Sequence, residues 1–185
     1  MAADFPPIPD ADWPEQIADL ADGYAGRLNV YRVMAHHPDL LRAWGGLRQQ
    51  VVIDTALGPE RSEVAILRTG HRMGSRYEWQ QHISRARALG MTDARIASIA
   101  GPLQGVTPQD AVIAGAVDQL FADKRLSKDR QRALVDLVGV KGMFDLIATV
   151  GMYSTLGYIL NSFDTPLDDD IAAELAARPF TADQG

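Results

Sequence analysis

The sequence predicts an all-α fold, and three observations carry that prediction. Apolar residues recur three or four positions apart through most of the 185-residue chain. No segment alternates apolar and polar residues for long enough to form a convincing strand. Glycine and proline stand at the ends of the periodic segments, where they stop or start helices. We therefore expect a bundle of about seven to nine helices.

Proline and composition divide the chain into three parts. Residues 1–13 are expected to form an extended arm, because their prolines remove backbone donors and disfavour helix at the preceding residues. Such an arm is suited to lie on a neighbouring subunit. Residues 14–165 are long enough for one well-packed domain, which we expect to be all-α. Residues 166–185 are expected to form a polar tail with a short helix.

Prolines and glycines mark the boundaries of the individual helices in the first half of the domain. Proline is tolerated in the first helical turn, which predicts helix starts at Pro14, Pro38 and Pro59. Glycine adopts the left-handed conformation that often ends a helix, which predicts helix ends at Gly58 and Gly74.

Hydroxyl residues are expected to cap the helices that follow. Ser75 is the predicted N-cap after Gly74, and Thr92 opens a shorter helix. Thr107 and Asp110 resemble a capping box with aspartate in the usual glutamate position. The expected helices cover residues 14–24, 29–36, 38–57, 59–73, 76–89, 92–99, 107–124, 127–139 and 141–163.

Two pairs of helices resemble each other loosely. The run SEVAILRTGHRMG followed by SRYEWQQH is echoed by QRALVDLVGVKG followed by MFDLIATVGMYS. We interpret this as an internal duplication of a helical hairpin, whose second copy lacks the polar residues of the first.

Composition and charge argue against several classes of function. With a net charge of -6 and scattered Lys and Arg, neither nucleic acid nor an anionic membrane is expected as the main partner. A small-molecule substrate or another subunit fits better. The absence of cysteine excludes disulfides, thiolate metal sites and thiol chemistry. The N-terminus lacks the basic start and apolar run of a signal peptide, so we expect a cytoplasmic protein.

The segment SRYEWQQH carries the strongest candidate site. On a helix, Ser75, Glu78 and His82 share one face. On the preceding helix, Glu63 shares a face with apolar residues, and a buried carboxylate needs a partner. His82 is the nearest candidate in an antiparallel hairpin, so we expect Glu63 and His82 to pair.

A Glu–His pair in a partly dry pocket is suited to proton transfer. The carboxylate fixes the tautomer and raises the basicity of the imidazole, which then exchanges a proton near neutral pH. Glu78 is expected to orient His82 or to act as a second acid. The other interpretation is a buried pair that only ties two helices together. A pair that opens onto a cavity of a few hundred Å³ would favour the enzyme, and a pair sealed among packed side chains would argue against it.

Three more residues are candidates for substrate binding. Arg68 would hold a substrate carboxylate or neutralise Glu63. His71 would face the same pocket or lie in a solvated turn, and Tyr77 would line a ligand pocket or pack in the core.

A metal set is the least favoured alternative. Glu78 and His82 stand at i, i+4, and Glu63 and His71 would complete four ligands. Because that spacing is a poor predictor, we expect no metal and no cofactor.

Several segments of the sequence, including the candidate site, resemble a known protein family. The run NVYRVMAHHPDLLRAW, and more specifically ERSEVAILR followed by YEWQQH, resembles the carboxymuconolactone decarboxylase family, which includes the alkylhydroperoxidase D-like proteins. The resemblance covers about residues 27–101 well and extends to about residue 163. It implies an alkylhydroperoxidase D-like helical bundle and a homo-oligomer, as a dimer, trimer or hexamer.

The peroxidase branch of that family has a glutamate, a C-x-x-C pair and a histidine. Glu63 and His82 match the glutamate and the histidine, whereas Ser75 and Glu78 stand at the cysteine positions. Without a thiolate there is no sulfenic acid and no resolving disulfide, so thiol peroxidase chemistry is excluded.

The decarboxylase branch needs no cysteine, metal or organic cofactor, and this chain keeps its Glu-x-x-x-His pattern at Glu78 and His82. The resemblance implies a cofactor-independent lyase or isomerase acting on a small carbonyl or lactone. His82, Glu63 and Glu78 would be catalytic, and the expected substrate-binding residues are Ser75, Arg68, His71 and Tyr77. The alternative is a non-catalytic, oligomeric ligand-binding or scaffold protein that keeps the fold.

Overall fold

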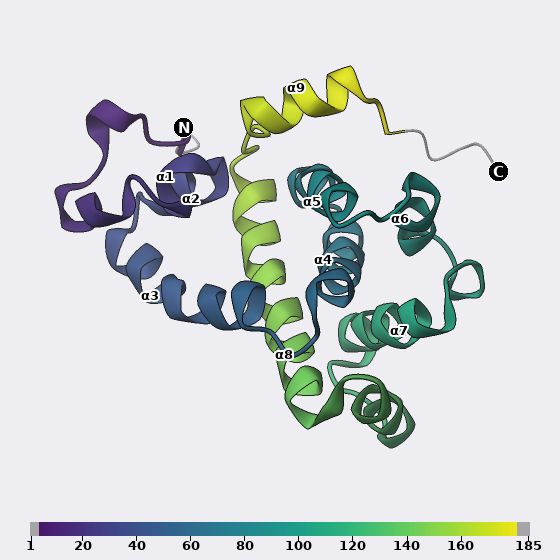
Figure 1. The fold of residues 1–185 in the computed structure, drawn as a ribbon. Coiled ribbons are helices and arrows are strands. Elements are labelled where there is room, and N and C mark those ends of the chain that lie inside the picture. Colours follow the sequence, from purple (N-terminus) through teal and green to yellow (C-terminus); the bar gives the residue numbers. More distant parts are fainter. Residues whose placement is uncertain (1–3, 181–185) are drawn as a thin grey trace.

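Two helices, α4 (Pro59–Met73) and α8 (Lys128–Ser162), organise the computed structural model, which describes residues 4–180 (Figure 1). α4 packs against α8 and against α5 (Arg76–Ala88) and α7 (Pro108–Asp123). Residues 4–180 contain helices and no strand, and this confirms the all-α prediction. No helix in the same range is both long and apolar enough to span a membrane.

Shorter helices surround this centre. The N-terminal ones lie on one side of α8, and α9 crosses over the end of α5 (Figure 1). They are α1 (Tyr24–Arg27), α2 (Asn29–Met34), α3 (Pro38–Arg48), α6 (Asp93–Ala100) and α9 (Asp169–Ala177). Short 3-10 turns cover Asp10–Asp12, Glu15–Leu20 and Leu103–Gly105, and a π-helical turn covers Gln49–Ile53.

Two predicted helices are wrong in extent. The helix expected over 14–24 is a 3-10 turn, because Ile17 leaves the helical region and the Trp13 indole donates to its carbonyl at 2.9 Å. The helix expected over 38–57 widens into the π turn and ends at Ile53. Beyond it, the backbone N–H of Ala56 donates to the Asp145 carboxylate of α8 at 2.7 Å, which turns the chain away from the helix axis.

The predicted caps are found, with one difference. Gly74 ends α4 in the left-handed conformation at φ 61°, and the Ser75 hydroxyl caps α5. Thr107 caps α7 by accepting from the Asp110 N–H at 3.1 Å. The Asp110 carboxylate does not complete the box, because it pairs with Arg95 of α6 at 2.9 Å.

The residues of the expected arm that the structure describes lie against α2 of the same chain. The N–H of Ile8 donates to the Arg32 carbonyl at 3.3 Å, and the Arg32 guanidinium donates back to the Ile8 carbonyl at 2.7 Å. The His36 ring contacts the Pro6 carbonyl at 2.8 Å.

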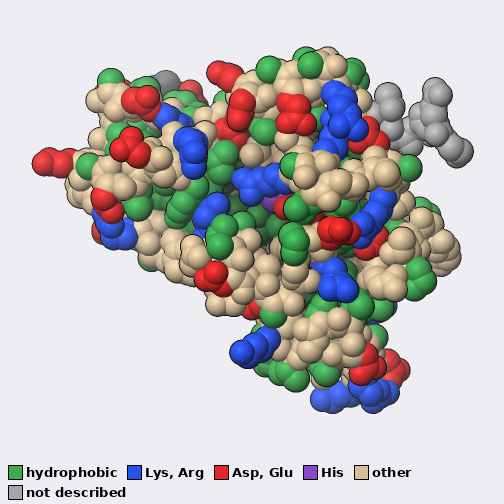
Figure 2. All heavy atoms as spheres, in the orientation of Figure 1, with side chains coloured by type: hydrophobic (Ala, Val, Ile, Leu, Met, Phe, Trp, Pro, Cys, Tyr) green, Lys and Arg blue, Asp and Glu red, His purple; other side chains and the backbone are tan. Residues whose placement is uncertain are grey.

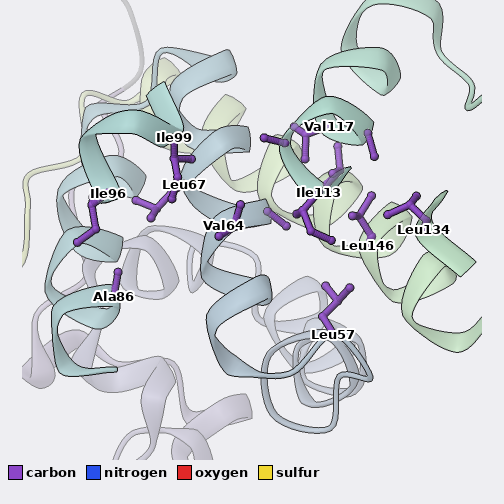
Figure 3. Close-up of a cluster of buried hydrophobic side chains, with 14 of the residues drawn as sticks. Leu57, Val64, Leu67, Ala86, Ile96, Ile99, Ile113, Val117, Leu134 and Leu146 are labelled. Carbon is purple, nitrogen blue, oxygen red and sulfur yellow. The ribbon is translucent and has the colours of Figure 1, made fainter. Parts of the chain in front are cut away.

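The core has two parts, one on each side of α4. The first contains Val64 and Leu67 of α4 and residues of α6, α7 and α8 (Figure 3). The second contains Ile66 of α4, together with residues of α2, α5 and the last turns of α8, among them Tyr77 and Tyr153. Glu63 and His82, the candidate pair, lie at the edge of this second part.

Candidate functional site

The hairpin of α4 and α5 brings Glu63 and His82 together as predicted. The Nδ1 atom of His82 lies 2.6 Å from Oε2 of Glu63. On the other side of the ring, Nε2 lies 3.5 Å from Oε2 of Glu78, one helical turn earlier. Both His82 and Glu78 are at most 3% exposed, so the imidazole is buried between two carboxylates.

Gly70 makes this approach of the two helices feasible. A Cβ atom at Gly70 would lie 3.2 Å from the Glu78 Cβ and 3.4 Å from the Trp79 nitrogen. With no side chain at this position, α5 packs closely on α4. The Glu63 carboxylate, two turns earlier on α4, therefore reaches the ring of His82.

Opposing effects act on the protonation of His82. Burial alone lowers its pKa, but the neighbouring Glu63 and Glu78 carboxylates outweigh burial and leave the pKa raised. The ring packs edge-on against Tyr153 with 5.2 Å between centroids. Burial, followed by the negative charge of Glu78, raises the pKa of Tyr153 well above its usual value. Relative to the free side chains, these shifts favour the neutral phenol and the charged imidazole.

A small cavity adjoins His82 and Glu78. Its volume of about 20 Å³ suits a single water molecule, so the few hundred Å³ expected for a substrate cavity are not found next to His82. The cavity is lined by Leu28, Val30, Tyr31, Arg48, Val52, Tyr77, Glu78, Gln81, His82, Arg85, Tyr153 and Leu156.

Two arginines give this cavity a cationic side. Among the residues that the structure describes, neither Arg48 nor Arg85 forms an ion pair with a carboxylate. Arg48 lies over the ring of Tyr24, 3.9 Å from its centroid. Figure 2 shows blue Lys and Arg side chains beside a hollow between the N-terminal helices and α5, where a small purple histidine surface is visible. Both guanidiniums are thus available to an anion.

Gln81 adds an unsatisfied polar group to the same cavity. The residue is 5% exposed, and its Oε1 atom is buried with no hydrogen-bond partner among the described residues. An unpaired buried amide oxygen is costly, so a water or ligand that donates to it would be favoured.

Of the four expected substrate-binding residues, Tyr77 alone lines the cavity. Its hydroxyl donates to Asp168 at 2.5 Å, and burial raises its pKa. Ser75 is buried and lies outside the cavity wall, where its hydroxyl caps α5.

Arg68 and His71 do not line the cavity, and His71 is the solvent-exposed histidine of the alternative interpretation. Arg68 points away from Glu63, because its guanidinium pairs with Asp118 at 2.6 Å and donates to the carbonyls of Ile99 and Gly101. It therefore ties α4 to α7 and to the end of α6. His71 is exposed in the last turn of α4, near the ring of Trp79, and does not line the cavity.

The candidate metal set is not assembled either. Within residues 4–180, no group of three or more His, Asp and Glu side chains is arranged to hold a metal ion. His71 lies two turns beyond Glu63 on α4 and does not reach the pair.

Three residues that line the cavity, Arg48, Arg85 and Tyr153, are not among the predicted site residues. Arg85 was detectable, because it stands three positions after His82 on the same helical face. Arg48 and Tyr153 come from α3 and α8, and their place beside His82 depends on how those helices pack.

Comparison with known proteins agrees with this fold. The family model of the carboxymuconolactone decarboxylase family matches residues 38–117, a segment that contains Glu63, Glu78 and His82. The expected resemblance is thus confirmed. No curated protein sequence matches the chain.

Solved structures with the same fold include members of the alkylhydroperoxidase D-like group. A variant of the debrominase Bmp8 in complex with 2,3,4-tribromopyrrole has a TM-score of 0.76 at 15% identity, covering 96% of this chain and 98% of that chain. The alkylhydroperoxidase AhpD core of an uncharacterized peroxidase-related protein from Ralstonia eutropha JMP134 has a TM-score of 0.73 at 16% identity, covering 92% and 96%. An uncharacterized peroxidase-related protein from Silicibacter sp. TM1040 has a TM-score of 0.76 at 11% identity, covering 92% and 93%.

Proposed function

We propose that this carboxymuconolactone decarboxylase family protein is a cofactor-independent lyase or isomerase that transfers a proton on a small, anionic carbonyl or lactone substrate. The observation that carries the proposal is a buried imidazole between two carboxylates, beside a cavity lined by two guanidiniums that form no ion pair within residues 4–180. Thiol peroxidase chemistry is not available to a chain without cysteine.

In this proposal His82 is the general acid and base. When a carboxylated unsaturated lactone loses carbon dioxide, the breaking C–C bond leaves its electron pair in a dienolate. The imidazolium then delivers a proton to carbon and takes another from water. Glu63, bonded to Nδ1, fixes the orientation of the ring and keeps the acid charged before transfer. Glu78 faces Nε2 and assists the return of the proton.

Charge balance supports an anionic substrate. With His82 protonated, the carboxylates of Glu63 and Glu78 and the guanidiniums of Arg48 and Arg85 leave one net positive charge. A substrate carboxylate would neutralise it, and a guanidinium binds a carboxylate in a bidentate manner. The two arginines take the role that the sequence suggested for Arg68.

A non-catalytic, oligomeric ligand-binding or scaffold protein is the second candidate. The cavity of about 20 Å³ favours it, because ordinary small-molecule sites measure roughly 300–1,000 Å³. In that case the pair of Glu63 and His82 would serve to hold α5 on α4.

Proton exchange in heavy water distinguishes the two candidates. The protein is incubated in D2O with carboxylated unsaturated lactones, β-keto acids and other enolisable acids, and deuterium bound to carbon is measured by NMR. We expect at least one class to exchange or decarboxylate, and His82→Gln to lower the rate by about a hundredfold or more.

The matched control is His71→Gln, which changes an exposed histidine outside the cavity and should keep the full rate. Circular dichroism and urea unfolding establish that both variants are folded. If His82→Gln retains the rate, the proton-transfer role is wrong. If no class reacts and His82→Gln changes only stability, the scaffold function is supported.

A further inference from the structure

A second and much larger cavity lies next to the His82 cavity. It has a volume of about 780 Å³, opens to solvent, and is lined by the start of α5, the end of α8, the following turn and α9. This volume is that of a small-molecule site, whereas the space beside His82 is about 20 Å³. We call the larger one the outer cavity.

The two cavities are neighbours along two helices. On α5, Gln80 lines the outer cavity and Gln81 lines the His82 cavity. On α8, Leu160 lines the outer cavity and Leu156, one turn earlier, lines the other. Tyr77 is the residue that contributes to both walls. Its side chain is therefore the partition between them.

Hydrogen bonds fasten this partition to the C-terminal segment. The Tyr77 hydroxyl donates to Oδ2 of Asp168 at 2.5 Å and accepts from the Val30 N–H at 3.4 Å. The other oxygen of Asp168 accepts from the Asn29 N–H at 2.6 Å. Asp168 directly precedes α9 and is 3% exposed. Asp168 thus links the Tyr77 hydroxyl to the start of α9.

We propose that the outer cavity is the entrance chamber of the His82 site and that Tyr77, held by Asp168, is the gate between them. The proposal rests on the proposed function, since the molecule admitted is the small anionic substrate. Arg76 lines the chamber, and within residues 4–180 it has no carboxylate within ion-pair distance. An anion would first meet Arg76 and then pass Tyr77 to reach Arg85.

The gate accounts for the size of the inner cavity. His82 is 2% exposed, and this burial strengthens its interactions with the two carboxylates. When the hydroxyl releases Asp168 and the ring turns, the two spaces join into one of substrate size. Closure behind the substrate would then exclude water from the reaction.

Chemical labelling of histidine tests the gate without any substrate. Diethyl pyrocarbonate acylates neutral imidazole, and mass spectrometry reports its rate at each histidine. The exposed His71 provides an internal reference in every sample. We expect Tyr77→Phe to raise the rate at His82 relative to His71 by about fivefold, because opening no longer breaks the hydrogen bond to Asp168.

A double variant tests the route. Ala172 lines the outer cavity, and Ala172→Trp places a large side chain there. Added to Tyr77→Phe, it should return the labelling of His82 to the wild-type rate. Tyr158→Phe, on the exposed face of α8, is the matched control and should change nothing.

The proposal is overturned if Tyr77→Phe leaves the rate unchanged, or if the increase persists in the double variant. Tyr77→Phe keeps the ring in the core, and circular dichroism establishes that each variant is folded. Labelling does not depend on turnover. If the protein is inactive but shows the expected labelling pattern, the proposed function is refuted and the proposed gate is still supported.

Discussion

At the scale of single residues, the main feature is the protonation of His82 between two carboxylates. Its Nδ1 atom lies 2.6 Å from the Glu63 carboxylate, and its Nε2 atom lies 3.5 Å from the Glu78 carboxylate. The residue is 2% exposed. Burial opposes the charged form and the two carboxylates favour it, with the second effect larger. The folded state therefore binds a proton more tightly than the unfolded chain does.

That difference predicts a pH-dependent contribution of His82 to stability. Because the folded pKa is raised, the contribution is fully present below the unfolded value of about 6.5 and is lost as the pH rises through the folded pKa. Urea unfolding of the wild type and His82→Gln at several pH values measures it. The wild type should be more stable than the variant by the largest margin at the acidic end. A margin that stays constant, or grows with pH, would contradict the assignment.

At the scale of elements, α8 is two helices joined at Gly139. The expected helices over 127–139 and 141–163 are both present, and Gly139 between them has φ 72° and ψ 175°. Only glycine adopts this conformation readily. The bend lets the first part of α8 pack on α7 while the second part runs along α4.

Two glycine variants in α8 should change stability in opposite directions. Gly139→Ala forces a side chain into the disfavoured conformation and should lower the free energy of unfolding by about 1–3 kcal/mol. Gly151→Ala lies in a regular, exposed helical turn and should raise it by about 0.5–1 kcal/mol. An added Cβ meets no atom within 4 Å at either position. The difference in stability between the two variants therefore reports the effect of backbone conformation. Urea unfolding measures both, and equal effects would contradict the conformational cause.

At the scale of the whole molecule, α8 presents an apolar face that the described chain leaves uncovered. Val140, Phe144, Ile147 and Tyr158 are between 40% and 66% exposed on this face. Monomeric proteins rarely expose apolar residues in such a row. Phe144 and Tyr158 lie at equal distances before and after Gly151, so two copies packed antiparallel would bring each phenylalanine to the tyrosine of the other.

We expect the protein to form a homo-oligomer through this face. Phe144→Glu should weaken self-association by about tenfold or more, since truncating an interface aromatic commonly costs more than 1 kcal/mol. Sedimentation velocity over a range of protein concentrations measures the change. The control is Leu89→Glu, which changes an apolar residue at the end of α5 that is 40% exposed and lies outside this face. A wild-type protein that is monomeric at all concentrations would refute the expectation.

The helical class, most helix boundaries and the pairing of Glu63 with His82 can be predicted from the amino-acid sequence alone. These follow from local rules: periodic apolar residues, caps such as Ser75, and a carboxylate placed on an apolar helical face. Both residues belong to one hairpin whose turn is marked by Gly74. Their hydrogen bond therefore depends mainly on the register of two adjacent helices.

The tertiary structure decided what surrounds that pair. Arg68 and Arg85 have the same chemistry in the sequence, and only packing assigns the first to Asp118 and the second to the cavity. Tyr153 and Asp168 reach the site from segments far along the chain. Contacts of this kind depend on the angles at which helices cross, and those angles are set by the packing of many side chains together, not by local sequence.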